Sequence, residues 1–186
     1  MANCQKAHQL TLVHEGGYVD DPDDRKTYKG ISRRFHGDWP GWAIVDELKG
    51  TADFPSCLYR HEGLNQKVAD FFKKEYWDSF WGDRIPDQQI ANELFDTSVN
   101  LGIKRAVTFL QKGLNVLNRN ELLYDDLHED GKFGDKTLTA LKTYLQRDNP
   151  SELMKVSNIL QGMHYIEYMR SSPTQEKYAR GWLARV

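Results

Sequence analysis

Apolar residues that recur with a helical period constrain the fold of this chain more than any other feature of its sequence. In segment 88–101 these residues cover a wide arc of the helix they would form: Ile90, Ala91, Leu94, Phe95, Val99 and Leu101. A helix that is apolar over so wide an arc needs neighbours on several sides to exclude water. We therefore predict a central, buried helix in this segment, ended by Gly102.

Narrower apolar stripes with the same period predict further helices around this central one. They lie at 4–14, 42–48, 65–80, 103–117, 135–145 and 151–171, with a short last helix that ends at Trp182. Residues 31–35 are predicted to add a helical turn or two. Segments 51–62 and 118–133 are predicted to be irregular loops. Strand alternation is nearly absent, apart from a short ribbon around Tyr28–Ile31. The predicted fold class is mainly α, with little or no sheet.

The first predicted helix stops at an acidic residue that is followed by two glycines, in the run His14-Glu15-Gly16-Gly17-Tyr18. Adjacent glycines are a strong helix stop, so Glu15 is expected on the last helical turn or just beyond it. The helix dipole is negative at that end and disfavours a second negative charge, which raises the pKa of a carboxyl group there. Such a group suits proton donation near neutral pH. The same spacing also fits an ordinary surface glutamate before a loop.

The motif Glu15-Gly16-Gly17-Tyr18 resembles the N-terminal signature of glycoside hydrolase family 108. The likeness continues in residues at matching places further along: Asp21-Pro22, Asp24, Thr27, Gly30-Ile31, Glu93–Asp96, Val99-Asn100, Gly102, Asp130-Gly131, Gly134, Thr137 and 181–186. It covers nearly the whole chain. One departure is a loop shorter than the usual family loop, with Arg25-Lys26 where the family commonly has a Pro-Gly-Gly run.

Members of this family are lysozyme-like muramidases; some are called secretion activators, and many are encoded by phages or prophages. The resemblance implies a lysozyme-like helical fold and cleavage of the β-1,4 bond between N-acetylmuramic acid and N-acetylglucosamine, in cell lysis by an endolysin or in protein secretion. It implies a catalytic lobe at residues 1–100 and a helical peptidoglycan-binding lobe at 101–186, packed together as one unit. Two alternatives stay open: a lytic transglycosylase acting on the same polymer, and a non-catalytic peptidoglycan-binding secretion accessory.

The resemblance also suggests which residues would perform catalysis. A glycosidase needs an acid for the leaving oxygen and usually a second carboxylate. The family assigns the acid to the glutamate that matches Glu15, and its later loop aspartate matches Asp24, our choice for the second carboxylate. Thr27 would position a water molecule. The acidic run 20–24 is equally typical of a solvated turn.

Substrate contacts are expected from one polar stripe and from aromatic rings. Glu93, Asp96 and Asn100 are spaced i, i+3 and i+7 on the apolar central helix, and we choose Asp96 and Asn100 to orient Glu15 or the sugar. Tyr18 and Tyr28 flank the acidic loop and are our candidates for walls that stack on sugar rings. Other aromatic residues with helical spacing, such as Trp77, fit the core better.

Composition limits the remaining possibilities. The net charge of -2 gives no electrostatic reason to expect a nucleic-acid partner. The six histidines and two cysteines, Cys4 and Cys57, lack the spacing of a metal site, so we expect no metal or cofactor. The cysteines are either two reduced thiols or one pair. No secretory signal is recognisable; we therefore expect synthesis in the cytoplasm and action on the cell wall, in the periplasm or outside, after release by a holin or another membrane export protein.

Overall fold

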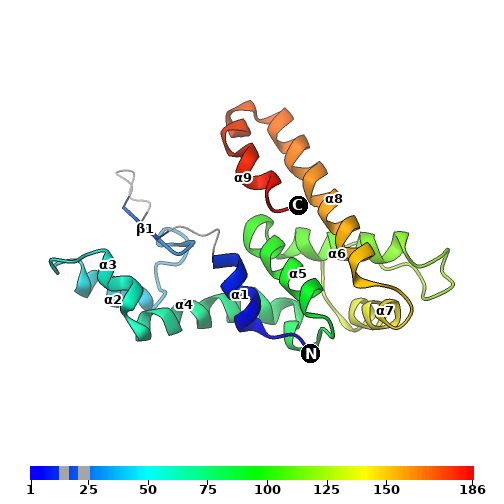
Figure 1. Cartoon of the computed structure of the whole chain (residues 1–186), viewed down its shortest axis with the longest axis horizontal. Helices are drawn as coiled ribbons and strands as arrows, with labels where there is room; N and C mark the ends of the chain where they lie inside the picture. The colour runs from blue at the N-terminus through cyan, green and yellow to red at the C-terminus, as the bar shows by residue number, and fades with distance from the viewer. Residues whose placement is uncertain (13–16, 21–25) are drawn as a thin grey trace.

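The computed structural model describes residues 1–12, 17–20 and 26–186 of the chain. Figure 1 shows an elongated molecule that is mainly helical, as the sequence predicts. The α-helices are α1 (Cys4–Leu12), α2 (Gly41–Leu48), α3 (Ser56–Arg60), α4 (Glu62–Glu75), α5 (Gln88–Leu101), α6 (Ile103–Val116), α7 (Asp135–Leu145), α8 (Pro150–Ser171) and α9 (Ala179–Leu183). Short 3-10 helices are η1 (Trp77–Phe80), η2 (Gly82–Arg84) and η3 (Pro173–Tyr178).

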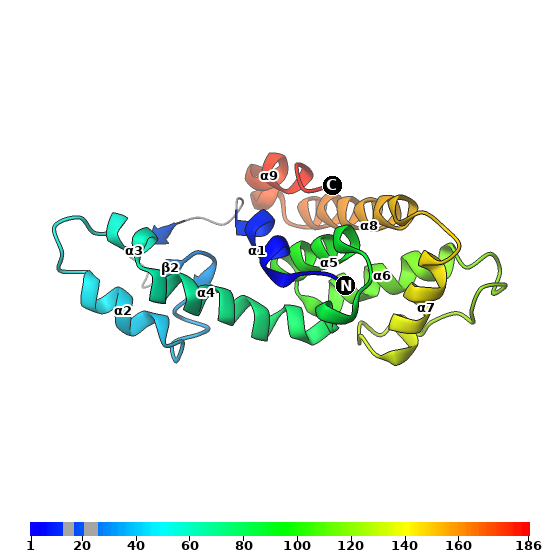
Figure 2. The ribbon, with the colours of Figure 1, turned by 60° about the horizontal axis from the view of Figure 1, so that its bottom comes forward.

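Helix α5 is the central element, as its wide apolar arc predicts. It packs against α1, α6 and α8, and Figure 2 shows α8 running alongside α5 and α6. The helix begins where the Asp87 side chain accepts a hydrogen bond from the Ile90 N–H at 2.9 Å. It ends at Gly102, whose φ of 89° is accessible mainly to glycine. The predicted bounds of this helix are confirmed.

The small sheet consists of β1 (Tyr18–Val19), β2 (Thr27–Tyr28) and β3 (Ile31–Ser32), in the antiparallel order β1-β2-β3. Lys29 and Gly30 join β2 to β3 with φ angles of 44° and 80°, as a two-residue hairpin turn with positive φ requires. This confirms the predicted ribbon. The predicted helical turn at 31–35 is confirmed only in part. Ile31 and Ser32 form β3, and one turn follows, in which the Ser32 carbonyl accepts hydrogen bonds from the N–H groups of Phe35 at 3.2 Å and His36 at 2.9 Å.

Two helix bounds differ from the prediction by three residues or more. The α4 helix starts at Glu62, three residues early, because His61 Nδ1 accepts a hydrogen bond from the Leu64 N–H at 3.1 Å. The predicted helix 65–80 is interrupted after Glu75, and its last residues form η1 instead. Helix α3 also lies within the segment predicted to be irregular.

Aromatic side chains form the core beside α5. The Trp77 ring is fully buried, and its centroid lies 5.6 Å from that of Phe80 and 6.0 Å from that of Phe95. Its indole N–H donates to Asp83 Oδ1 at 2.8 Å. A Cβ atom on Gly82 would lie 2.2 Å from the Trp77 ring, so this glycine allows the close approach. Trp77 is therefore a core residue, as its spacing suggests.

The C-terminal segment turns back from α8 toward α5 (Figure 1). The Trp182 ring of α9 stacks on Tyr165 of α8, with 5.5 Å between the ring centroids. This contact holds α9 against α8 and leads the last residues to α5, where Arg185 meets Asp96. Both cysteines are free. In the part of the chain that the structure describes, no helix is long and apolar enough to cross a membrane.

Candidate active site

A groove of about 300 Å³ lies where α1, α5, α8 and the C-terminal segment meet. Its α5 side is polar and is formed by Gln89, Asn92, Glu93 and Asp96. The last turn of α1 contributes Leu10 and Thr11, α8 contributes Met154, and Arg185 closes the C-terminal side. The groove thus adjoins the end of α1, just before the Glu15 motif in the sequence.

Asp96 lies in this groove and is held there by Arg185. Arg185 Nη1 donates to both carboxylate oxygens of Asp96, at 2.9 and 3.0 Å. The Arg185 side chain is 10% exposed and that of Asp96 21%, so the pair is largely removed from water. The structure therefore brings Asp96 to the groove but commits its carboxylate to an ion pair. Whether Asp96 orients the sugar stays a prediction.

Glu93 lies in the groove one helical turn before Asp96. Thr97 Oγ1 donates to Glu93 Oε1 at 3.2 Å. Burial raises the pKa of Glu93 to about 7; the Thr97 hydrogen bond lowers it, and the negative charge of Asp96 raises it further. Glu93 therefore changes charge near neutral pH. The sequence placed Glu93 in the polar stripe, but we did not choose it as a site residue, because spacing alone does not reveal burial.

Asn100 does not lie in the groove. Its Nδ2 donates to the hydroxyl of Tyr165 on α8, and Gln161 Nε2 donates to the same hydroxyl at 2.7 Å. Tyr165 is buried. Asn100 therefore belongs to a polar network between α5 and α8, and the structure does not bring it to the predicted position beside the sugar.

The small sheet lies near the end of α1. In Figures 1 and 2 the end of α1 lies between the sheet and α5. Thr27 pairs with Val19 and Ser32, so its backbone is held in the middle strand. Tyr28 is fully buried, and its hydroxyl donates to the Leu58 carbonyl at 3.2 Å. Tyr28 cannot offer a ring face to a sugar in this structure, which corrects its predicted role.

Tyr18 is the predicted sugar-stacking residue that stays partly exposed. Its ring meets Phe54 edge to face, with 4.9 Å between centroids. Its hydroxyl donates to Asp20 Oδ2 at 3.1 Å, and Lys49 Nζ donates to the same oxygen at 2.8 Å. These contacts fix the orientation of the ring on the first strand. Tyr18 therefore remains a candidate wall.

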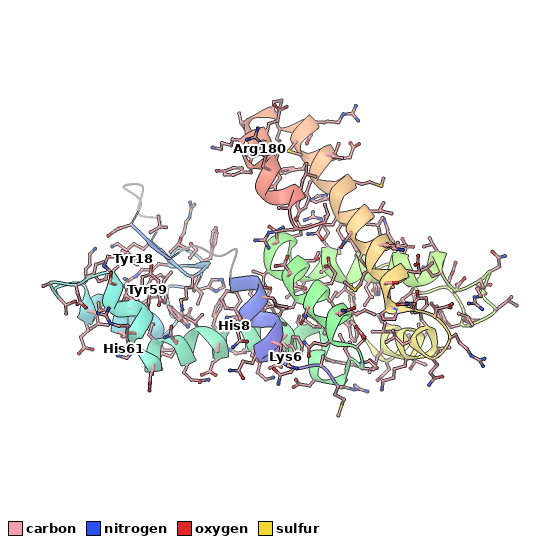
Figure 3. All side chains as sticks on the ribbon, viewed as in Figure 1. Lys6, His8, Tyr18, Tyr59, His61 and Arg180 are labelled. Atoms are coloured by element: carbon pink, nitrogen blue, oxygen red, sulfur yellow. The ribbon has the colours of Figure 1, made fainter. Side chains whose placement is uncertain are left out.

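Gly17, the second glycine of the motif, is needed for a close contact with Tyr59. A Cβ atom at Gly17 would lie 2.0 Å from the Tyr59 hydroxyl oxygen. The Tyr18 N–H donates to that same oxygen at 3.3 Å, and Figure 3 shows Tyr18 and Tyr59 together at the sheet end of the molecule. This contact anchors the chain two residues after Glu15.

Gly17→Ala is expected to lower the free energy of unfolding by about 1 kcal/mol, because the new methyl group overlaps the hydroxyl end of Tyr59, a partly exposed side chain that must shift. It is also expected to slow any reaction that depends on Glu15. Urea unfolding measures the first effect. Tyr59→Phe removes the overlapping oxygen and leaves the ring carbon Cζ 3.1 Å from the added Cβ, so the double variant should regain part of the loss. Equal stability of Gly17→Ala and wild type would contradict this expectation.

His8 of α1 packs against Phe72 of α4 and Phe95 of α5, with 5.2 and 6.4 Å between ring centroids. Burial lowers the pKa of His8 to about 4, and the positive charge of Lys29 lowers it further. Lys29 Nζ donates to Asn65 Oδ1 at 2.9 Å, which holds this cation against α4. His8 is therefore uncharged at neutral pH.

Two known protein families match this chain. Residues 8–102, more than half of the chain, match the family described as "Glycosyl hydrolase 108". The chain belongs to the glycosyl hydrolase 108 family. Residues 105–186 of this family 108 protein match a second family, described as "Predicted Peptidoglycan domain". The two matches together support a peptidoglycan hydrolase.

The structure of Brucella abortus SagA is similar to that of this family 108 protein, with a TM-score of 0.63. The sequences are 24% identical, and the match covers 98% of this chain and 88% of SagA. At this identity the likeness shows a shared fold. The sequence has no significant match among the curated proteins.

Two predicted catalytic residues of this family 108 protein, Glu15 and Asp24, lie outside the described residues. Both fall within the 8–102 match. Among the residues that the structure does describe, no group of three or more His, Cys, Asp or Glu side chains could hold a metal ion.

Proposed function

We propose that this protein is a lysozyme-type N-acetylmuramidase that cleaves the β-1,4 bond between N-acetylmuramic acid and N-acetylglucosamine in peptidoglycan. The observation that carries the proposal is the match of residues 8–102, which include Glu15, to glycosyl hydrolase 108. The peptidoglycan-domain match at 105–186 supports the choice of polymer.

In the proposed mechanism, protonated Glu15 donates its proton to the glycosidic oxygen as the bond breaks. Asp24, or a water molecule positioned by Thr27, acts on the opposite face of the sugar. Tyr18 stacks on a sugar ring, and Asp96 helps to shape the groove through its ion pair with Arg185.

The groove supports this assignment by its size and position. Its volume of about 300 Å³ is at the lower end of the range for ligand pockets, about 300–1,000 Å³. It includes Leu10 and Thr11 in the last turn of α1, and the sheet lies on the other side of that helix (Figure 1). We therefore propose that the glycan strand passes across the end of α1, between the groove and Tyr18.

The arrangement along the chain and the place of action follow as further parts of the proposal. We assign catalysis to residues 1–100 and wall binding to 101–186. Because peptidoglycan lies outside the cytoplasmic membrane, we place the protein's action at the cell wall, after release by a holin or another export protein. Lysis and protein secretion are the two roles that such a hydrolase would serve.

The chemistry is tested by digesting purified peptidoglycan with the full-length protein and separating the soluble products by mass. A muramidase is expected to release muropeptides with reducing N-acetylmuramic acid ends. Products with 1,6-anhydro ends would replace hydrolysis by lytic transglycosylation. Binding to the polymer with no released product would instead identify a non-catalytic wall-binding protein.

A further inference from the structure

The Glu93 carboxyl group has no role in the proposed mechanism, and one of its oxygens is open to a further contact. Thr97 Oγ1 donates a hydrogen bond to Glu93 Oε1 at 3.2 Å, whereas Glu93 Oε2 has no hydrogen-bond partner among the described residues. Oε2 is not among the buried atoms without a partner in the described part of the chain, so solvent reaches it, and a ligand in the adjoining groove can take the place of that water.

The Glu93 side chain lines two neighbouring spaces. One is the groove of about 300 Å³, and the other is a smaller, partly open space of about 20 Å³ between α5, α6 and α8. The smaller space has room for about one water molecule, so the groove is the space that can take a ligand.

The groove residues around Glu93 fit an acetamido group. Leu10 and Met154 give the groove an apolar side, suited to a methyl group. Gln89 and Asn92 bring amide groups that both donate and accept hydrogen bonds. A neutral carboxyl group donates through its O–H to an amide carbonyl oxygen, whereas a carboxylate would repel that oxygen.

We propose that Glu93 binds the acetamido group of an N-acetylated amino sugar, with the Oε2 hydroxyl donating to the acetamido carbonyl oxygen and the methyl group packing against Leu10 and Met154. Glu93 is then a specificity-determining residue of the groove. This inference rests on the proposed carbohydrate substrate and adds which group of the sugar the groove recognises.

The charges near Glu93 make this contact sensitive to pH. From α5 it faces Asp96, and from the C-terminal segment Arg185, which is paired with Asp96. The described residues of α1, α6 and α8 that line the two spaces with Glu93 carry no charge. Because the pKa of Glu93 is raised to about 7, the carboxyl is neutral below that pH and charged above it. Binding that needs the neutral form is lost as pH rises through 7.

The test is an NMR titration of the full-length protein with tetra-N-acetylchitotetraose at pH 5.5 and pH 8.5, in a Glu15→Gln background that prevents turnover. One required proton with a pKa of about 7 predicts an affinity about 30-fold weaker at pH 8.5. Adding Glu93→Gln should remove most of this difference, because the amide N–H donates at either pH. Glu93→Ala should bind weakly at both.

Glu167→Gln is the matched control, since it makes the same chemical change at an exposed position on α8 and should keep the pH dependence. Cellotetraose, which has a hydroxyl in place of each acetamido group, should bind weakly with no such dependence. No binding of chitotetraose, or equal affinity at both pH values, would overturn the role of Glu93. So would an unchanged pH dependence in Glu93→Gln, whose folding is checked by thermal unfolding at each pH.

The muropeptide analysis and this titration test different proposals, and either proposal can be overturned while the other holds. A protein that releases no product but binds chitotetraose with the expected pH profile keeps the acetamido site and loses the muramidase proposal. A protein that cleaves peptidoglycan but binds chitotetraose equally at both pH values keeps the enzyme and loses the site.

Discussion

Glu15→Gln is expected to slow peptidoglycan cleavage by about 10²–10⁴-fold, the usual contribution of a positioned general acid. The amide has nearly the same size as the carboxyl group but has no proton of suitable acidity to give to the leaving oxygen. The measurement is the initial rate at which reducing ends appear in a suspension of purified peptidoglycan, at equal protein concentrations.

Two controls separate loss of chemistry from loss of folding or binding. Glu167→Gln changes an exposed glutamate on α8, whose ion pair with Arg170 lies at the surface, and should keep the wild-type rate. Sedimentation with insoluble peptidoglycan should show that Glu15→Gln still binds the wall. Equal cleavage rates for Glu15→Gln and wild type would remove Glu15 from the mechanism.

Trp77→Ala is expected to lower the free energy of unfolding by about 3–5 kcal/mol, the usual loss for a large buried aromatic residue. The Trp77 ring is fully buried against Phe80 and Phe95, so its removal leaves a cavity in the core. The substitution also leaves Asp83 without the 2.8 Å hydrogen bond from the indole. Urea unfolding, followed by tryptophan fluorescence and by circular dichroism, gives the difference.

Phe35→Ala provides the comparison, because this aromatic side chain is 77% exposed. Its removal should change the free energy of unfolding by less than about 0.5 kcal/mol. A loss below about 1 kcal/mol for Trp77→Ala would contradict a core position for Trp77 and would reopen the possibility that it contacts sugar.

The position of α5 links these expectations. The helix packs on α1, which leads to the Glu15 motif, and on α8, which leads to the C-terminal segment. Its polar residues lie on both of these sides. Glu93 and Asp96 line the groove, whereas Asn100 donates a hydrogen bond to the Tyr165 hydroxyl on α8. One helix therefore connects the part that matches glycosyl hydrolase 108 to the part that matches the peptidoglycan domain.

The sequence by itself determined the mainly α fold and the bounds of its most regular helices. Segments 88–101 and 135–145 were predicted with the bounds that the structure has, because helical hydrogen bonds and stripes involve residues only three or four positions apart. The short ribbon around Tyr28–Ile31 was also predicted, and its turn falls at Lys29-Gly30. The family was predictable because its motif lies in one short stretch around Glu15.

Only the tertiary structure decided which side chains meet in the groove. Asp96 and Arg185 are 89 positions apart in the chain, and no local pattern pairs them. The same holds for burial: Tyr18 and Tyr28 look alike in sequence, yet one stays partly exposed and the other is enclosed beside Leu58. The raised pKa of Glu93 has the same origin, since desolvation depends on how α1, α5 and α8 pack together rather than on spacing along one helix.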